Sequence, residues 1–155
     1  MSDRPTFEYN GHPVRAAGIL VYTIQDQRVL RLFRNIKGRL EDIGGKTDKV
    51  DSNEVETAVR ECVEETHGKL FDNRHTPQEC ANILRDLIAT TCETEYNKRS
   101  KYLLFKVHVH PGILEQPMMR FGLKEKTEWG ELDHYYQWKS GKPWKRHPRL
   151  FGMTL

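Results

Sequence analysis

The sequence has 155 residues, of which 37% are hydrophobic and 30% are charged, and its formal net charge at pH 7 is +3. This length and composition predict one globular domain over residues 1–155 and argue against a disordered or fibrous chain. The net charge is too small to indicate a nucleic-acid partner, and no apolar run is long enough to cross a bilayer, so we expect a soluble, cytoplasmic protein with no membrane partner.

Two strands are the first elements predicted along the chain. Residues 18–24 and 28–33 are rich in β-branched and aromatic side chains, and the polar residues 25–27 lie between them. This pattern is typical of a β-hairpin. A loop then leads to a further strand-like segment that ends at Gly44-Gly45, where the absence of side chains lets the backbone approach a ligand closely.

A helix is predicted after these glycines. Asp51 or Ser52 is suited to cap its N-terminus, and Glu54 is placed to close a capping box on Asp51. Gly68 is expected to end the helix. Apolar residues recur at helical spacing and would face the sheet: Val55, Ala58, Val59, Cys62 and Val63.

The second half of the chain predicts another helix and further strands. Residues 76–79, Thr-Pro-Gln-Glu, combine an N-cap, a proline in the first turn and a capping-box glutamate. Residues 102–110 alternate between apolar and polar side chains, as in a half-buried strand, and a short strand is expected around residues 127–129. From Leu132 onward the aromatic and basic tail is expected to form a helix, broken around residues 141–143.

The first predicted helix carries a cluster of carboxylates. On a helix, residues three or four positions apart are neighbours, so Glu61 lies beside both Glu64 and Glu65. Like charges at this spacing repel unless solvent screens them or a cation compensates them. A hard divalent cation suits such an oxygen-rich cluster, and Mg²⁺ commonly joins one or two carboxylates to substrate phosphates. A solvated, charged helix face is the alternative interpretation.

At these residues the chain resembles the Nudix hydrolase superfamily, whose signature runs glycine, five residues, glutamate, seven residues, then Arg-Glu-aliphatic-x-Glu-Glu-x-Gly-aliphatic. Gly45 matches the first glycine, and residues 60–65, Arg-Glu-Cys-Val-Glu-Glu, match the core of the second half. The loop is one residue longer than in the signature, so the loop glutamate falls on Asp51, with Asp48 and Glu54 as alternatives. His67 stands where the signature has its late glycine.

The resemblance implies an α+β fold, an α/β/α sandwich in which a mixed β-sheet lies between helices. It also implies a Nudix pyrophosphohydrolase, in which water attacks a diphosphate linkage with Mg²⁺ or Mn²⁺ as the cofactor. The metal ligands would be Glu61, Glu64 and Glu65 together with the carbonyl of Gly45, and Arg60 would orient a neighbouring glutamate. Glu61 is the first candidate for the general base.

The expected substrate is a nucleoside diphosphate derivative: a dinucleoside polyphosphate, a nucleotide sugar or a modified nucleoside triphosphate. Basic residues on either side of the glycines are candidates for contact with its phosphates: Arg34, Lys37, Arg39 and Lys46. Glu128 is a further candidate for contact with the substrate or for the proton-transfer role.

Two alternative functions stay open. Aromatic residues of the tail alternate with basic ones, as in surfaces that stack on bases and attract phosphates, which favours an RNA 5′-cap hydrolase: Tyr135, Tyr136, Trp138, Lys139, Lys142, Trp144, Lys145 and Arg146. The other alternative is a Nudix-like module that binds nucleotides or RNA without hydrolysing them. Loss of a core carboxylate would mark such a module, and all three glutamates are present.

Overall fold

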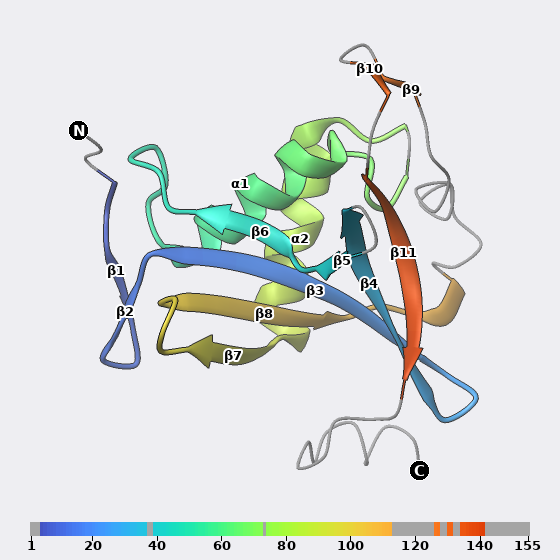
Figure 1. Ribbon diagram of the computed structural model, residues 1–155, viewed down its shortest axis with the longest axis horizontal. Coiled ribbons are helices and arrows are strands. Elements are labelled where there is room, and N and C mark those ends of the chain that lie inside the picture. The colour runs from blue at the N-terminus through green and yellow to red at the C-terminus, as the bar shows by residue number, and fades with distance from the viewer. Residues whose placement is uncertain are drawn as a thin grey trace.

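A computed structural model describes residues 4–36, 39–72, 74–112, 126–127, 130–131 and 134–141 of the protein. In this part of the chain, strands form a mixed β-sheet against which two helices pack (Figure 1). The helices are α1 (Glu54–Thr66) and α2 (Pro77–Thr91). The strands are β1 (Phe7–Tyr9), β2 (His12–Val14), β3 (Ala16–Gln25), β4 (Arg28–Ile36), β5 (Arg39–Glu41), β6 (Ile43–Lys46), β7 (Glu93–Asn97), β8 (Tyr102–His108), β9 (Lys126–Thr127), β10 (Gly130–Glu131) and β11 (His134–Gly141).

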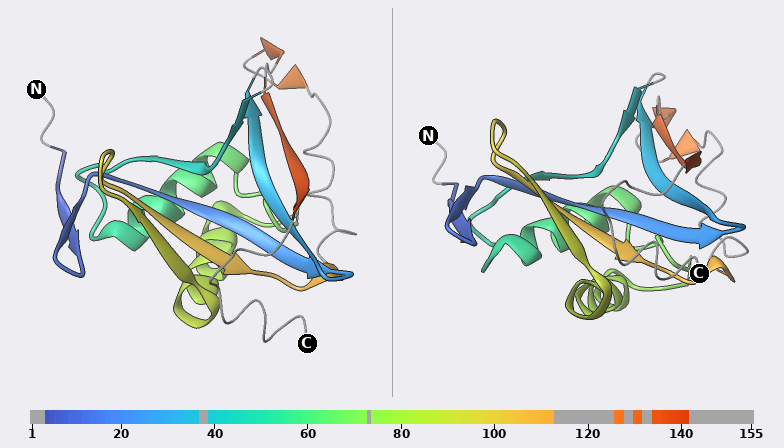
Figure 2. Two further views of the ribbon diagram at one scale, coloured as in Figure 1. Left: turned by 60° about the horizontal axis from the view of Figure 1, so that its bottom comes forward. Right: turned by 90° about the horizontal axis from the view of Figure 1, so that it is seen from below.

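The main sheet divides along β3. Strand β6 pairs with the first half of β3 and β4 pairs with its second half, both antiparallel, while β8 runs parallel to β3 along its other edge. The full order is β11-β4-β3-β8-β7, with β5 added to the end of β4. Because the partner on one edge of β3 changes from β6 to β4, strands β4 and β11 turn away from the rest of the sheet (Figure 2). The segment that joins β5 to β6 therefore lies where the two halves of the sheet diverge.

The predicted hairpin is confirmed as β3 and β4. Its turn is shorter than expected, because Gln25 pairs with Arg28 and only Asp26 and Gln27 remain unpaired. Both turn residues have positive φ, 52° and 63°, which matches the twist of a two-residue hairpin loop.

Both predicted helices are present, and their ends differ in how well the sequence predicted them. Thr76 caps α2 with the complete capping box to Glu79. The N-cap of α1 is Asn53, whose side chain accepts a hydrogen bond from the Glu56 amide at 3.0 Å. Neither Asp51 nor Ser52 caps this helix, so that expectation was wrong. The carboxylate of Asp51 instead binds side chains from within α1.

The hydrophobic core joins both helices to one face of the sheet. Side chains at alternate positions of β3 and β8 contribute to it, as do buried residues of the two helices: Ile19, Val21, Leu103, Phe105, Val107, Ala58, Val59, Cys62, Leu84 and Ile88. The views agree that α1 and α2 lie beside each other against the sheet (Figure 1, Figure 2). The expected α+β class with a mixed sheet is therefore confirmed. Neither of the two described helices is long and apolar enough to span a membrane.

The expected helix after Leu132 is wrong for the part that the structure describes. Residues 134–141 form β11, which pairs with β4 in antiparallel register from His134–Ile36 to Gly141–Val29. Aromatic residues favour strands, and β4 offers a free edge that this segment completes. The short strand expected around residues 127–129 is partly seen as β9, and residues 128, 129 and 142–155 lie outside the described chain.

Candidate active site

Arg60 on α1 ties the loop after β6 to the helix. Its Nε and Nη2 donate to the two carboxylate oxygens of Asp51 at 2.7 and 3.0 Å, and Nη2 also donates to the Lys46 carbonyl at 2.9 Å. Asp51 accepts two more hydrogen bonds, from the Thr57 hydroxyl at 2.7 Å and from the Asp48 amide at 2.9 Å. Four donors therefore converge on one carboxylate whose side chain is only 2% exposed. These contacts hold Asp51 as a structural anchor of the loop.

The same network shifts the pKa of both ionised partners. Burial alone would raise the pKa of Asp51, but the hydrogen bonds from Arg60, Thr57 and the Asp48 amide outweigh it and lower that pKa. The hydrogen bond to Asp51 raises the pKa of Arg60 above its ordinary value. Both groups are therefore charged across the physiological pH range.

Glu61 lies directly against the glycine that begins the motif. A Cβ atom built on Gly45 would lie 2.5 Å from Oε2 and 2.6 Å from Oε1 of Glu61, so only glycine leaves room for this carboxylate beside β6. Oε1 of Glu61 also accepts from Arg60 Nη1 at 3.1 Å. The strand and the helix thus fix the Glu61 carboxylate from two sides.

Glu65 lies one turn further along α1 and pairs with an arginine from β4. Its Oε1 is 2.9 Å from Nη1 of Arg34, and the two side chains are 17% and 19% exposed. Burial raises the pKa of Glu65 to about 7; the cation of Arg34 lowers it, and the carboxylate of Glu61 raises it further. Glu61 and Glu65 are therefore close enough for their charges to repel, as their spacing on the helix predicted.

The remaining candidates are placed less centrally. The Glu64 side chain is 59% exposed and approaches Arg60 Nη1 only at 3.4 Å. Arg39 is 73% exposed and pairs with Glu41 at 2.8 Å, while Lys46 contributes its backbone carbonyl to Arg60. The side chain of Asp48 accepts from the Val50 amide, and Glu54 begins α1. Lys37 and Glu128 lie outside the described residues.

Within the described residues, no three acidic, histidine or cysteine side chains are assembled as a metal-binding group. The expected convergence of Glu61, Glu64 and Glu65 is therefore only partial. Glu61 and Glu65 interact across the face of α1 that meets Gly45 and Arg34, and Glu64 turns toward solvent.

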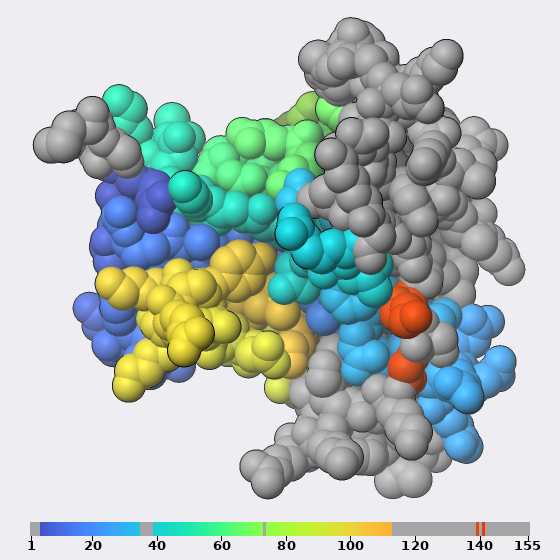
Figure 3. All heavy atoms as spheres, viewed as in Figure 1, coloured from blue at the N-terminus to red at the C-terminus, as the bar shows by residue number. Residues whose placement is uncertain are grey.

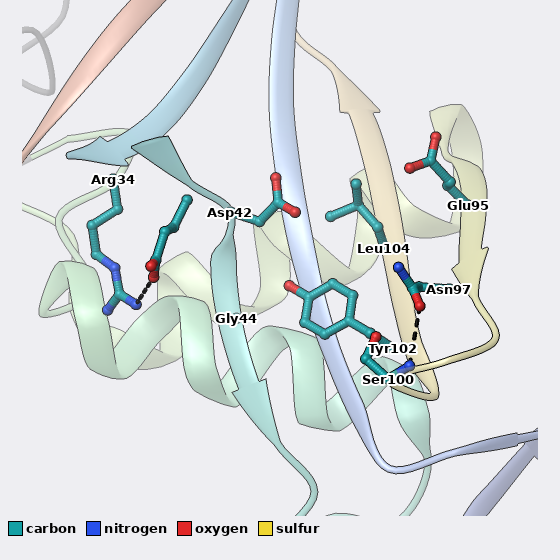
Figure 4. Close-up of a pocket in the computed structure, with 9 residues that line it drawn as sticks. Arg34, Asp42, Gly44, Glu95, Asn97, Ser100, Tyr102 and Leu104 are labelled. Atoms are coloured by element: carbon teal, nitrogen blue, oxygen red, sulfur yellow. Dashed lines mark hydrogen bonds and ion pairs between the residues drawn. The ribbon is translucent and has the colours of Figure 1, made fainter. Parts of the chain in front are cut away.

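A pocket of about 360 Å³ opens next to Arg34, on the face of the sheet away from the helices. Its lining residues come from β4, β5, β6, β7, β8 and the turns between them: Arg34, Glu41, Asp42, Gly44, Glu95, Asn97, Ser100, Tyr102 and Leu104. Figure 4 shows Arg34 at one end of the pocket, Asp42 and Tyr102 in the middle, and Glu95 and Asn97 at the other end. Except for Arg34, sequence reasoning named none of these residues as site residues.

Two facing glycines make room for the tyrosine of this pocket. Gly18 and Gly44 pair across β3 and β6, and a Cβ atom on either would collide with the Tyr102 hydroxyl. Burial raises the pKa of Tyr102, and the nearby carboxylates of Asp42 and Glu65 raise it further. The phenol therefore stays protonated near neutral pH and can donate a hydrogen bond into the pocket.

Comparison of the sequence with models of known protein families and with curated proteins found no match.

The raised pKa of Glu65 predicts a pH-dependent stability. Because its folded pKa of about 7 lies above the ordinary 4.5, the folded chain binds more protons than the unfolded chain between these values. This group's contribution to stability is therefore present below pH 4.5 and is lost as the pH rises through 7. Without divalent cations, we expect the free energy of unfolding of wild type, measured by urea denaturation, to fall more between pH 5 and pH 8 than that of Glu65→Gln. Parallel pH profiles for the two proteins would contradict this expectation.

Replacing the two adjacent glycines of β6 by alanine, one at a time, is expected to have different effects. At Gly45 the substitution should displace a side chain, and at Gly44 it should lower the stability of the fold. At Gly45 the new Cβ meets the end of the flexible Glu61 side chain, so the fold should survive while Glu61 is displaced, and any activity that depends on Glu61 is expected to fall by roughly 10²-fold. At Gly44 the new Cβ lies 2.6 Å from the Gly18 Cα and 2.7 Å from the Ala17 carbonyl oxygen, which are backbone atoms. We expect Gly44→Ala to lower the free energy of unfolding by about 1–3 kcal/mol. Thermal melts and turnover measured on both variants check this contrast, which fails if Gly45→Ala is the less stable of the two.

Proposed function

We propose that this protein is a Mg²⁺- or Mn²⁺-dependent hydrolase of the Nudix type that cleaves a diphosphate linkage in a nucleoside diphosphate derivative. The observation that carries the proposal is the arrangement around Arg60. Residues that the Nudix-like motif places far apart in sequence, Gly45, Asp51 and Arg60, lie in contact with one another or with Glu61. A charged helix face without function would not need a glycine to receive one of its carboxylates.

The donor set suits a hard divalent cation. Glu61 and Glu65 are partly buried, and the negative charge of Glu61 is one of the causes that raise the pKa of Glu65. Mg²⁺ is commonly held by one or two protein carboxylates and completes its shell with water and substrate phosphates, so two close carboxylates meet this requirement. Glu61 and Glu65 would hold the ion, with the Gly45 carbonyl and the more exposed Glu64 as further ligands. The bound ion would supply charge neutralisation at the phosphate oxygens and a more acidic water.

The chain's own residues would divide the remaining work. Arg60 keeps the loop, β6 and α1 in fixed relation, so the two carboxylates are positioned before substrate binds. Arg34, which neutralises Glu65 in the present structure, is placed to turn its guanidinium to a substrate phosphate once Glu65 has another cation to bind. Glu61, held by Arg60 at 3.1 Å, is the candidate to accept the proton of the attacking water.

Removal of an RNA 5′ cap is a second candidate function. The turn between β7 and β8 carries Lys98, Arg99 and Lys101 as exposed residues, and Ser100 of the same turn lines the pocket. A basic rim beside a nucleotide pocket would attract an extended phosphate backbone. Truncating the chain before Trp138 would not test this idea, because it would remove half of β11 from the sheet.

Product analysis tests the proposed function. The purified full chain would be incubated with Mg²⁺ and with dinucleoside polyphosphates, nucleotide sugars, modified nucleoside triphosphates and capped RNA, each with and without EDTA. Metal-dependent release of a nucleoside phosphate from a diphosphate linkage would support the proposal. The absence of any metal-dependent product from the whole panel would overturn it and favour a binding module.

A further inference from the structure

The pocket beside Arg34 shares this arginine with the candidate active site. Arg34 lines the pocket and at the same time pairs with Glu65 on α1 and, at 3.6 Å, with Glu41. A substrate whose phosphates lie at Arg34 and Glu65 would therefore place its adjoining group in this pocket. Its volume of about 360 Å³ falls in the range of small-molecule sites. Figure 3 shows that the β7–β8 hairpin and the β5–β6 segment, which border the pocket, lie on one face of the molecule.

The charges in the pocket disfavour phosphate and favour a group with N–H donors. Its charged lining residues are three carboxylates and one guanidinium, and that guanidinium already serves Glu65 and Glu41. Of the three carboxylates, Glu41 pairs with arginines and Glu95 accepts from Lys106 at 2.9 Å. The lining includes Ser100 but none of its basic neighbours. A neutral or cationic donor group is therefore the complementary ligand.

Asp42 is the carboxylate that is left to bind such a ligand. Its carboxyl group makes no hydrogen bond to any of the residues that the structure describes, and Figure 4 shows it between Arg34 and Tyr102. Burial raises the pKa of Asp42 and the charge of Glu95 raises it further, while Lys106 lowers it. Hydrogen bonds from a ligand to the ionised carboxylate would offset this burial.

A carboxylate can accept two parallel N–H bonds, and the nucleobases differ in whether they offer them. Guanine presents N1–H and the 2-amino group side by side. Adenine and cytosine present one amino group beside an acceptor nitrogen, and uracil presents one N–H between two carbonyls. The pocket also offers donors for the guanine O6: the Tyr102 hydroxyl and the Asn97 amide nitrogen, since the amide oxygen of Asn97 already accepts from the Ser100 amide at 3.0 Å.

We propose that Asp42 binds the Watson–Crick edge of a guanine base in this pocket, so that the substrate is a guanosine diphosphate derivative. The inference rests on the proposed function, because it names the base of the same substrate. The guanosine diphosphate group can come from a free nucleotide or from the 5′ cap of an RNA, and both present the same base edge and the same phosphates.

Equilibrium binding of nucleoside monophosphates to the full chain tests this assignment without turnover. Calorimetry with Mg²⁺ would compare GMP, AMP, CMP and UMP on wild type, Asp42→Asn and Asp86→Asn, the last being an exposed aspartate of α2. We expect wild type and Asp86→Asn to bind GMP roughly 10-fold to 100-fold more tightly than AMP, CMP or UMP. We expect Asp42→Asn to lose this preference. Equal affinity for all four bases in wild type, or an unchanged preference in Asp42→Asn, would overturn the assignment.

A change in the ligand provides a test that does not depend on the variant folding. Inosine monophosphate keeps N1–H but lacks the 2-amino group, so it should bind wild type about tenfold more weakly than GMP. Equal binding of the two would overturn the paired-donor contact.

Turnover assays distinguish a free nucleotide from an RNA cap as the substrate. They also separate the base assignment from the proposed function. The enzyme would be given GDP-sugar against ADP-sugar, and RNA capped with guanosine against RNA capped with adenosine. Preference for guanosine in either pair supports the assignment, and the pair that is cleaved identifies the source. Equal cleavage within both pairs would overturn the base assignment and leave the proposed function standing. A guanine preference in binding without any hydrolysis would support the base assignment and overturn the proposed function.

Discussion

Replacing Glu65 by Gln is expected to reduce turnover of a diphosphate substrate by about 10²-fold or more while leaving the protein folded. Gln keeps the size of the side chain and can still accept a hydrogen bond from Arg34, so the contact between α1 and β4 survives. It has no negative charge with which to hold a divalent cation. Steady-state kinetics with Mg²⁺, together with a circular dichroism spectrum of each protein, measure the effect.

Glu64→Gln provides an internal comparison for this prediction. Glu64 is 59% exposed, and its contact with Arg60 is long, at 3.4 Å. We therefore expect a smaller loss of kcat there than at Glu65. Glu65→Gln turnover within twofold of wild type would mean that this carboxylate takes no part in the reaction. Equal losses at both positions would mean that Glu64 contributes as much as the partly buried Glu65.

Replacing Asp51 by Asn is expected to lower the free energy of unfolding by about 3 kcal/mol. Two donors of Arg60 and the Thr57 hydroxyl converge on this carboxylate, and the amide nitrogen of Asn would face donors where an acceptor is needed. Asp48→Asn, three residues earlier in the same loop, is the matched control. Among the described residues, its exposed side chain accepts only from the Val50 amide, a bond that Asn can keep, so we expect a change within about 0.5 kcal/mol.

The acid sensitivity of the two loop variants should also differ. Because the folded pKa of Asp51 is lowered, its contribution to stability is present above its ordinary pKa and is lost as the pH falls through the folded value. Urea denaturation at pH 7 and at a pH well below 3.8, the ordinary pKa of aspartate, measures both effects. The account of the loop is wrong if Asp51→Asn and Asp48→Asn have the same stability at pH 7.

Local signals in the sequence predicted the helices well, except where a long-range partner competes for a capping residue. Thr76 and Glu79 cap α2 as expected because no other group binds them within the described chain. Asp51 had the right residue type and position to cap α1, but Arg60, nine residues later, pairs with it by a charge-assisted, bidentate contact that is stronger than a neutral cap. Asn53 takes the cap instead, and α1 begins at Glu54.

The end of α1 shows how the helix stops although the sequence differs there from the Nudix signature that it resembles. His67, which stands where the Nudix signature has glycine, adopts the left-handed conformation with φ of 56°, and Gly68 follows with φ of 71°. The Gly68 amide then donates to the Val63 carbonyl at 2.9 Å, which closes the helix. The expected stop near Gly68 was therefore right, although a non-glycine residue takes the first left-handed position.

The carboxylates of the candidate site could be predicted from helical spacing, but their partners could not. Neighbours on one helix, such as Arg60 and Glu64, follow from the sequence alone. The pair Arg34 and Glu65 depends on where β4 crosses α1, which no local pattern specifies. The pocket was missed for the same reason, because Asp42, Asn97 and Tyr102 come from separate segments with no fixed spacing. The one available signal was Gly18 inside an otherwise apolar strand, which often marks a close approach of another group.

The central claim, metal-dependent attack of water on a diphosphate, is tested most directly by following the oxygen of that water. The full chain would be incubated with Mg²⁺ and its best substrate in water enriched in oxygen-18, and the phosphate-bearing products would be analysed by mass spectrometry. The account predicts one labelled oxygen in a product phosphate for each substrate cleaved, no product in EDTA, and almost none with Glu65→Gln. Cleavage that continues in EDTA and in Glu65→Gln, or products that carry no label, would contradict it.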